Sequence, residues 1–279
     1  MCNVSISTVN LSVGYHRSTD TSSRAGSVRA VQSDLNLTFY EGETVALLGP
    51  NGSGKSTLLR TLAGLQPPVA GDCNLLSLTP HELAQRLALV LTENNSVENT
   101  SVHDVIAMGR YPYTSFLGGL GDRDEQIITE ALRMVCGSGT ADEADDSLSM
   151  ERMFNALSDG EKQRVLIAKA IAQQTPVILL DEPTAHLDLP SRIRTFRLLR
   201  ELAHERKKTV LVSTHELDLA LQTADRVLLL SKQNIPPRLD TVENLIADDA
   251  FTAAFGMDVF SAVKPMENEK ERQLLSKKL

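Results

Sequence analysis

The chain has few of the features that mark membrane-spanning or secreted proteins. Its three cysteines, Cys2, Cys73 and Cys136, are widely spaced and odd in number, which provides neither a disulfide framework nor the spacing of metal ligands. No apolar run approaches the roughly eighteen residues of a membrane span. The first ten residues lack the basic start and apolar run of an export signal. We therefore expect a protein of a reducing, cytosolic compartment that neither crosses a membrane nor is exported.

Basic residues are also fewer than acidic ones. With 28 Lys and Arg against 36 Asp and Glu, the formal net charge is -8. This balance disfavours a nucleic-acid partner, because phosphate binding needs a basic face, although a local basic patch can occur in an acidic chain. The chain does have 42% hydrophobic residues over 279 positions, which is enough for one large or two modest domains.

Predicted strands and helices alternate along most of the chain. The expected strands are 4–13, one before the turn at 41–43, a buried strand ending at Leu48, and 176–180, 209–213 and 226–230. The expected helical segments are 55–65, most of 93–175, and 191–206. The polar stretch 16–27, the aromatic stretch "GRYPYTSFLGG" and the acidic stretch "GSGTADEADDS" are expected to be loops. The alternation predicts an α/β fold with a mainly parallel sheet.

The clearest motif is "GPNGSGKST" at 49–57, between a predicted buried strand and a predicted helix. It matches G-x-x-x-x-G-K-[ST], in which backbone N–H groups cradle phosphates. In this pattern Lys55 reaches the β and γ oxygens and the Ser56 hydroxyl holds Mg²⁺. A chance glycine-rich turn is the alternative, but the flanking strand and helix are the context that phosphate binding requires.

Two acidic residues end the apolar strand "VILLDEP" at 177–183. Asp181 can complete the shell of the magnesium ion, and Glu182 can orient or deprotonate a water in line with the γ-phosphate. Taken alone, Asp-Glu-Pro is more often a plain exit from a strand. Beside a phosphate loop the hydrolytic interpretation is favoured, and His215 in "VLVSTHE", after a neighbouring strand, is expected to face the same phosphates.

The stretch "LSDGEKQR" at 157–164 predicts the start of a helix. Ser158 and Glu161, three positions apart and followed by an apolar run, form the pattern of a capping box. Gly160 is not explained by a cap, because glycine in a first turn costs backbone entropy and adds no packing.

In order and rough spacing, the loop around Lys55, "LSDGEKQR", "LLDEPTAHLD" and "STHE" resemble the motifs of an ATP-binding cassette (ABC) ATPase, over nearly the whole chain. The resemblance implies a P-loop NTPase with an N-terminal antiparallel β portion and an inserted α-helical subdomain, which hydrolyses ATP with Mg²⁺. It equates 49–57 with the Walker A loop, 177–182 with the Walker B strand, and 185–188 with the D-loop. The implied site residues are Lys55, Glu182 and His215 for catalysis; Ser56 and Asp181 for the metal; and Tyr15, Gly49, Pro50, Asn51, Gly52, Ser53, Gly54, Lys55, Ser56, Thr57, Ser158 and Gly160 for the nucleotide.

Three positions depart from the family pattern. The family signature is usually Leu-Ser-Gly-Gly-Gln and closes over the γ-phosphate held by the other subunit, whereas this chain has Asp159 and Glu161. Glu161 adds a negative charge that weakens this closure unless its carboxylate turns back into the capping box. Thr92 stands where the family carries Gln, and we expect the neighbouring Glu93 or a water to replace that Gln in nucleotide sensing.

One phosphate loop and one signature imply that two chains pair head-to-tail, as a homodimer. An ATPase of this family that drives transport docks on integral-membrane permease subunits at the cytoplasmic face of the membrane, and a substrate-binding protein completes the system. Residues 101–119 resemble the corresponding segment of iron-siderophore, haem and cobalamin importers, of which siderophore import is favoured. This segment holds three of the eleven aromatics, counting 4 Tyr and 7 Phe, which either form a partner surface or pack under their own subdomain.

Two functions other than transport are left open. A soluble ABC ATPase, for example in Fe–S cluster assembly, is the first alternative, and a phosphate-loop kinase is a more distant one. We expect a single ABC ATPase domain at 1–263, with a core at about 1–92 and 176–235, a helical subdomain at about 93–175 and an extension at 236–263. The acidic loop 137–147 and the charged tail 264–279 are expected to be solvated surface.

Overall fold

The structure is a computed structural model that describes residues 3–16, 28–91, 99–114, 119–136, 148–185, 187–232 and 235–256. Predictions for Thr92, Glu93, the acidic loop 137–147 and the tail 264–279 lie outside these residues. No helix within the described ranges is long and apolar enough to cross a membrane.

The centre of the fold is a mainly parallel sheet. Its strands, in spatial order, are β10 (Arg238–Asp240), β9 (Arg226–Leu229), β4 (Thr44–Leu48), β8 (Thr209–Ser213), β7 (Val177–Asp181) and β6 (Leu87–Val90). Every neighbouring pair in the sheet is parallel except β10 with β9. The carboxyl ends of β4, β7 and β8 therefore meet at one edge, where open parallel sheets bind their ligands.

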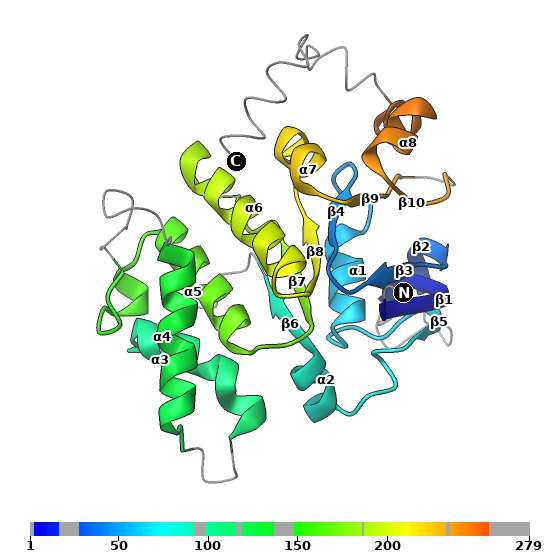
Figure 1. Cartoon of the computed structure of the whole chain (residues 1–279). Coiled ribbons are helices and arrows are strands. Elements are labelled where there is room, and N and C mark those ends of the chain that lie inside the picture. The colour runs from blue at the N-terminus through cyan, green and yellow to red at the C-terminus, as the bar shows by residue number, and fades with distance from the viewer. Residues whose placement is uncertain are drawn as a thin grey trace, which may run out of the picture.

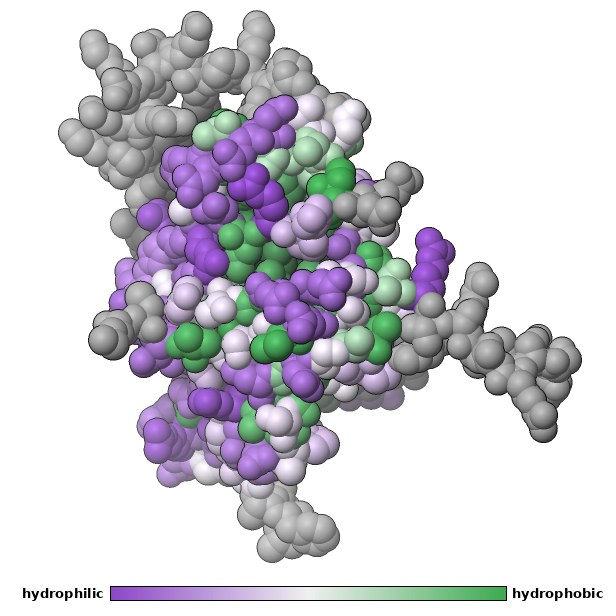
Figure 2. Space-filling model, turned by 90° about the vertical axis from the view of Figure 1, so that its right-hand side faces the viewer, coloured by the Kyte–Doolittle hydropathy of each residue, from purple (hydrophilic) through white to green (hydrophobic). Residues whose placement is uncertain are grey.

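A second, antiparallel group of strands lies beside the central sheet. The long strand β1 (Val4–His16) pairs with β2 (Val28–Leu35), β3 (Thr38–Tyr40) and β5 (Ala70–Cys73). Figure 1 shows these strands on one side of the sheet and a group of helices on the other. On the antiparallel side, Figure 2 shows apolar residues in small patches between polar ones.

The helical group follows β6 in the sequence. It contains α3 (Val102–Ala107), the 3₁₀ helix η1 (Met108–Tyr113), α4 (Asp122–Cys136), the 3₁₀ helix η2 (Phe154–Ala156) and α5 (Asp159–Ala172). Its own apolar core joins α3, α4 and α5 through residues such as Ile106, Ile128 and Val165, none of which is exposed. The remaining helices are α1 (Lys55–Leu62), α2 (Pro80–Arg86), α6 (Leu189–His204), α7 (Leu217–Thr223), α8 (Val242–Ala247) and α9 (Ala250–Phe255).

Successive side chains of β4 pack on opposite faces of the sheet, and both faces are buried. Val45 and Leu47 pack with α1 and the antiparallel strands, whereas Ala46 and Leu48 pack with α7, α8 and α9. All five residues of β4 are buried, as expected for a parallel strand that is covered on both sides. The position of the loop after Leu48 is therefore fixed by packing on both faces.

The predicted fold class is confirmed, with corrections to individual elements. Strand β1 extends to His16, where a loop was expected to begin, and the strand expected before the 41–43 turn is two strands, β2 and β3. Helix α1 ends at Leu62 because Gly64, at φ +70°, adopts a left-handed conformation that turns the chain away. The first half of the aromatic stretch is the 3₁₀ helix η1, and β5 and α2 were not predicted.

Candidate active site

The loop 49–57 joins β4 to α1 at the carboxyl edge of the sheet. Two of its glycines are required by space and by backbone conformation. A Cβ on Gly49, at φ +150°, would lie 2.2 Å from the carbonyl oxygen of Leu230, and one on Gly54, at φ +99°, would lie 2.9 Å from Val31 Cγ1. Gly54 then caps the N-terminus of α1, where unpaired backbone N–H groups favour anions.

Lys55 folds back over this loop. Its Nζ donates a hydrogen bond of 2.8 Å to the carbonyl oxygen of Gly49, and the residue is only 6% exposed. Burial lowers the pKa of Lys55, the carboxylates of Glu182 and Asp181 oppose that shift, and the charge of Lys232 adds to it. A buried ammonium held among loop carbonyls is placed to meet phosphate oxygens.

The loop also retains hydrogen-bonding capacity. The Ser53 hydroxyl is buried and has no hydrogen-bond partner among the described residues. Buried polar groups are usually paired, so an unpaired hydroxyl inside a phosphate-loop motif is consistent with a ligand that supplies oxygen atoms. Together with the α1 N-terminus, it supports the fit of a nucleotide phosphate to this loop.

A hydroxyl–carboxylate cluster lies directly beneath the loop. Asp181, at the end of β7, accepts hydrogen bonds at Oδ1 from Ser56 Oγ (3.0 Å) and from Ser213 Oγ (2.6 Å). Ser213 ends the neighbouring strand β8 and is paired with Asp181 in register. A hydroxyl and a carboxylate are oxygen ligands of the kind that Mg²⁺ prefers, with phosphate oxygens and waters completing its shell. Ser56 and Asp181 therefore fit a magnesium ion, and Ser213 orients the carboxylate.

Glu182 occupies a constrained backbone position. Its φ is +49°, a left-handed conformation that is uncommon for a residue other than glycine. The strand end holds it there, because its backbone N–H donates to both the carbonyl oxygen (3.1 Å) and Oγ (3.0 Å) of Ser213. Residues held in rare backbone conformations cluster at functional sites, where the surrounding structure maintains the strain.

His215 faces Glu182. Its Nε2 lies 2.7 Å from Glu182 Oε1, and the two side chains are 47% and 30% exposed. An imidazole at this distance can hold the carboxylate in one orientation and exchange a proton with the group that it contacts. The structure thus brings Lys55, Ser56, Asp181, Glu182 and His215 to one edge of the sheet.

Tyr15 lies at the other end of the loop. Its hydroxyl shares a hydrogen bond of 2.9 Å with Thr57 Oγ1, and 55% of the residue is exposed. It lines a cavity of about 1270 Å³ that continues past Gly52, Gly54 and Thr57. An exposed ring beside the phosphate loop is in a position to stack on a nucleotide base, which remains a prediction.

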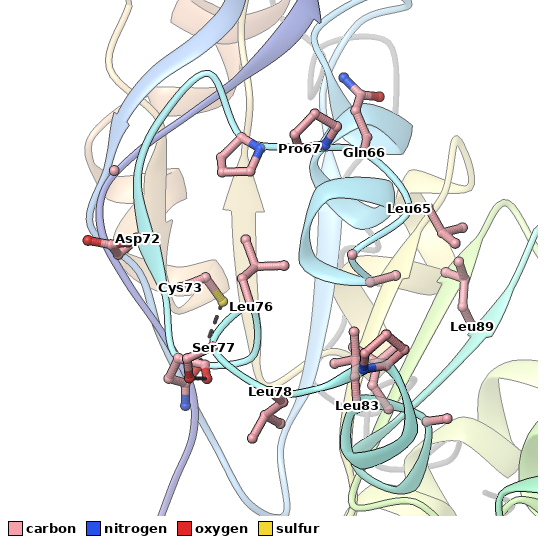
Figure 3. A pocket seen from close by; sticks show the side chains of 18 of the residues that line it. Leu65, Gln66, Pro67, Asp72, Cys73, Leu76, Ser77, Leu78, Leu83 and Leu89 are labelled. Carbon is pink, nitrogen blue, oxygen red and sulfur yellow. Dashed lines mark hydrogen bonds between the residues drawn. The ribbon is translucent and has the colours of Figure 1, made fainter.

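A second cavity, of about 900 Å³, lies away from this edge. Figure 3 shows its lining between the end of α1, β5, α2 and β6, where Leu76, Leu78, Leu83 and Leu89 make it largely apolar. None of the predicted site residues lines it.

The predicted capping box at α5 is confirmed. Ser158 caps the helix, its Oγ accepting from the Glu161 N–H, while Glu161 Oε2 accepts from the N–H and the Oγ of Ser158, both at 2.8 Å. Glu161 Oε1 lies 2.6 Å from Arg152 NH1, and Asp159 lies 3.5 Å from Lys162 Nζ. The Glu161 carboxylate therefore turns back into the helix start. This is the orientation expected to keep its negative charge from weakening closure over a nucleotide.

Ser158 and Gly160, which were predicted to bind the nucleotide, do not contact the phosphate loop of their own chain through a hydrogen bond among the described residues. Helix α5 begins in the helical group rather than at the sheet edge. Residues 185–188 follow Glu182, but His186 is outside the described residues. The sequence reasoning missed Ser213, whose signal was a hydroxyl at the end of the strand before His215.

These elements define the class of the protein: an α/β ATPase with a phosphate loop, an acidic strand end and a capped helix of the cassette type. A family model described as ABC transporter matches residues 32–185, more than half of the chain. The chain belongs to the ABC transporter family, and it is an ATPase.

Curated relatives resemble most of the chain. The iron(3+)-hydroxamate import ATP-binding protein FhuC of Bacillus subtilis is 32% identical over 270 residues, which cover 95% of this chain and 93% of that protein. The hemin import ATP-binding protein HmuV of Escherichia coli O157:H7 is 36% identical over 242 residues, 83% of this chain and 88% of that protein.

Solved structures show the same fold. A putative metal-chelate type ABC transporter in an inward-facing conformation matches with a TM-score of 0.72 and 30% identity, over 90% of this chain and 89% of that chain. The dimeric cassette MJ0796 matches with a TM-score of 0.70 and 26% identity, over 85% of this chain and 98% of that chain.

Proposed function

We propose that this chain is the ATP-hydrolysing subunit of a membrane importer, with iron-siderophore complexes as the favoured cargo and haem or cobalamin as alternatives. It works as a homodimer on integral-membrane permease subunits at the cytoplasmic face of the membrane, with a substrate-binding protein in the complete system. The observation that carries the proposal is the meeting of Lys55, Asp181 and Glu182 at one sheet edge in a chain whose curated relatives import hydroxamate-bound iron and hemin.

Each site residue has a role in hydrolysis. Lys55 and the N–H groups of the loop bind the β- and γ-phosphates, and Tyr15 stacks on the base. Ser56 and Asp181 hold Mg²⁺, which neutralises charge that develops on the phosphate oxygens. Glu182 accepts a proton from the attacking water, and His215 keeps the carboxylate in line with the γ-phosphate.

We base the proposed homodimer on contacts that one chain does not make among its described residues. Ser158 and Gly160 make no hydrogen bond to their own phosphate loop among the described residues, whereas the helix start they form is exposed at Ser158 and Asp159. A second chain supplies the missing contact when its phosphate loop faces this helix start. The dimeric state of the similar cassette MJ0796 supports this arrangement.

The 3₁₀ helix η1 offers a surface for the permease. Tyr111 and Tyr113 are 59% and 41% exposed, so these aromatics do not pack beneath their own subdomain. Arg110 anchors the segment: it is buried, donates to Asp124 (2.8 Å) and to the carbonyl oxygen of Ala172 (2.8 Å), and lies 4.3 Å from the centre of the Tyr113 ring. Aromatic side chains on a rigid support are frequent in protein interfaces.

Co-purification and stimulation test the proposal. The tagged chain is isolated from detergent-solubilised membranes of its own cells, and the ATPase rate is compared with and without the retained polytopic membrane protein in liposomes. We expect retention and a higher ATPase rate. The variant Tyr111→Ala/Tyr113→Ala loses both, whereas Ile246→Ala, which alters an exposed side chain on α8, keeps both. ATPase activity with no membrane partner and no response to any permease contradicts the importer proposal and favours a soluble role.

A further inference from the structure

A cation that the phosphate-loop motif does not include lies beside the loop. Lys232 follows β9, the strand that pairs with β4 on the side opposite β8. Its Cε and Nζ come within 3.5 and 3.9 Å of the position that a Cβ on Gly52 would occupy. The ammonium therefore lies next to the middle of the 49–57 loop, although it is 180 residues away in the sequence.

Backbone contacts fix the segment that carries Lys232. The N–H of Leu230 donates to the carbonyl oxygen of Leu48 (2.8 Å), and the carbonyl oxygen of Leu230 packs so closely on Gly49 that no side chain fits there. Residues 230–232 are thus pressed against the start of the phosphate loop. The fold therefore keeps the side chain of Lys232 near the loop.

A buried amide ties the same segment to the loop a second time. Gln32 on β2 is 6% exposed, and its Nε2 donates to the carbonyl oxygens of both Ser53 (2.8 Å) and Ser231 (2.7 Å). The two N–H bonds of one amide group are therefore used to hold the loop and the segment before Lys232 at a constant separation. Loss of this amide would leave two carbonyl groups without their side-chain donor.

No acidic side chain among the described residues lies within salt-bridge distance of Lys232. The ammonium of Lys232 also repels that of Lys55: burial lowers the pKa of Lys55, and the charge of Lys232 lowers it further. Two cations facing one loop repel each other when the loop is empty, and an anion bound between them removes that cost. Lys232 also lines the cavity of about 1270 Å³ that contains Tyr15, Gly52 and Thr57.

We propose that Lys232 is a further nucleotide-binding residue, a second cation that attracts the polyphosphate of ATP and ADP into the 49–57 loop. The inference rests on the proposed nucleotide site and adds to it a residue outside the motif. Because the Lys232 ammonium is exposed and is a point charge rather than a planar group with several fixed donors, it acts on the total charge of the phosphates. Its effect should therefore grow from AMP to ADP to ATP and weaken with salt.

Equilibrium binding to charge variants tests this inference. The dissociation constants of AMP, ADP and a non-hydrolysable ATP analogue are measured for the full chain, for Lys232→Gln, Lys232→Arg and Lys232→Glu, and for Lys207→Gln as the matched control. Lys207 is exposed and precedes β8, at the opposite end of that strand from the site. At low ionic strength we expect Lys232→Gln to weaken binding of the ATP analogue about three- to tenfold, Lys232→Glu to weaken it more, and Lys232→Arg to retain it.

The outcomes separate this inference from the proposed function. The inference is supported if the loss of affinity is largest for the ATP analogue, smaller for ADP and smallest for AMP, and if all variants bind nucleotide alike near 1 M salt. Equal affinity of Lys232→Gln and the unaltered chain at low salt overturns it, as does an equal loss for all three nucleotides, which indicates a structural effect. Failure of the unaltered chain to bind any nucleotide overturns the proposed nucleotide site instead.

Discussion

The ion pair between Arg152 and Glu161 offers the sharpest test of how the start of α5 is held. Glu161 is one of two acidic residues that depart from the family signature, and its carboxylate contacts both Ser158 and Arg152. Burial raises the pKa of Glu161, but hydrogen bonds from the Ser158 backbone and from Arg152 outweigh this and leave the pKa below its usual value. The carboxylate is therefore ionised at neutral pH and depends on Arg152 for its counter-ion.

Replacing Arg152 by Ala removes that counter-ion and leaves the capping box in place. The two side chains are 35% and 14% exposed, which puts the pair between an exposed pair, worth up to about 1 kcal/mol, and a buried one, whose loss costs about 3–5 kcal/mol. We expect a coupling energy of about 1–2 kcal/mol, equivalent to about a 5- to 30-fold change in an equilibrium constant. In the proposed homodimer, the carboxylate that has lost Arg152 would also add an uncompensated negative charge near the ATP of the second chain.

A double-mutant cycle isolates this pair from the other contacts of Arg152. Arg152→Ala, Glu161→Gln and the double variant are compared in urea unfolding. Their ATP-driven dimerisation is measured by sedimentation in a Glu182→Gln background that turns ATP over slowly. Arg152→Ala should weaken the dimer about tenfold, and Glu161→Gln should restore most of the loss. The reasoning is refuted if Arg152→Ala dimerises like its parent, or if the double variant is no better than Arg152→Ala alone.

Three further predictions concern the site and the helical group. Lys55→Ala should raise the dissociation constant of ATP at least tenfold in calorimetry, because it removes the ammonium held by Gly49; unchanged affinity would argue against the phosphate-loop interpretation. His215→Ala should lower the turnover number at least tenfold with ATP affinity retained, since it releases Glu182, and unchanged turnover in a phosphate-release assay would contradict this. The hydrogen bond from His103 to Glu125 raises the pKa of His103, so the protonated imidazole stabilises the fold at low pH and this stabilisation is lost as the pH rises through the raised pKa. The difference in thermal midpoint between the unaltered chain and His103→Gln should therefore shrink from pH 6 to pH 9. A difference that grows over this range would contradict the assignment.

Local signals in the sequence predicted the parts of the site that depend on consecutive residues. The 49–57 motif, the apolar strands and the Ser158–Glu161 spacing each carry their own physical reason, and the structure has the loop, β7, β8 and the capping box where they were expected. Helix α2 carried a similar signal that was not used: Thr79 caps it in a capping box with Glu82, and Pro80 occupies its first turn.

Contacts between distant segments could not be predicted in the same way. Ser213 contacts Asp181 only because β7 and β8 pair in one register, and Gln32 links two carbonyl groups that no spacing in the sequence brings together. The break between β2 and β3 follows Asp34, at φ +56°, a conformation that is uncommon for a residue other than glycine. The pairing of Ser158 and Gly160 with a second chain cannot be read from one chain, and it remains a prediction.

Replacement of Glu182 by Gln tests the central claim, that the Glu182 carboxylate, directly after β7, activates the water that attacks ATP. Single-turnover hydrolysis and ATP affinity are measured on the same preparation, with Lys207→Gln as the surface control. The account predicts that hydrolysis slows by about two to four orders of magnitude while ATP affinity is retained and an ATP-bound dimer accumulates. Hydrolysis at the unaltered rate would contradict it.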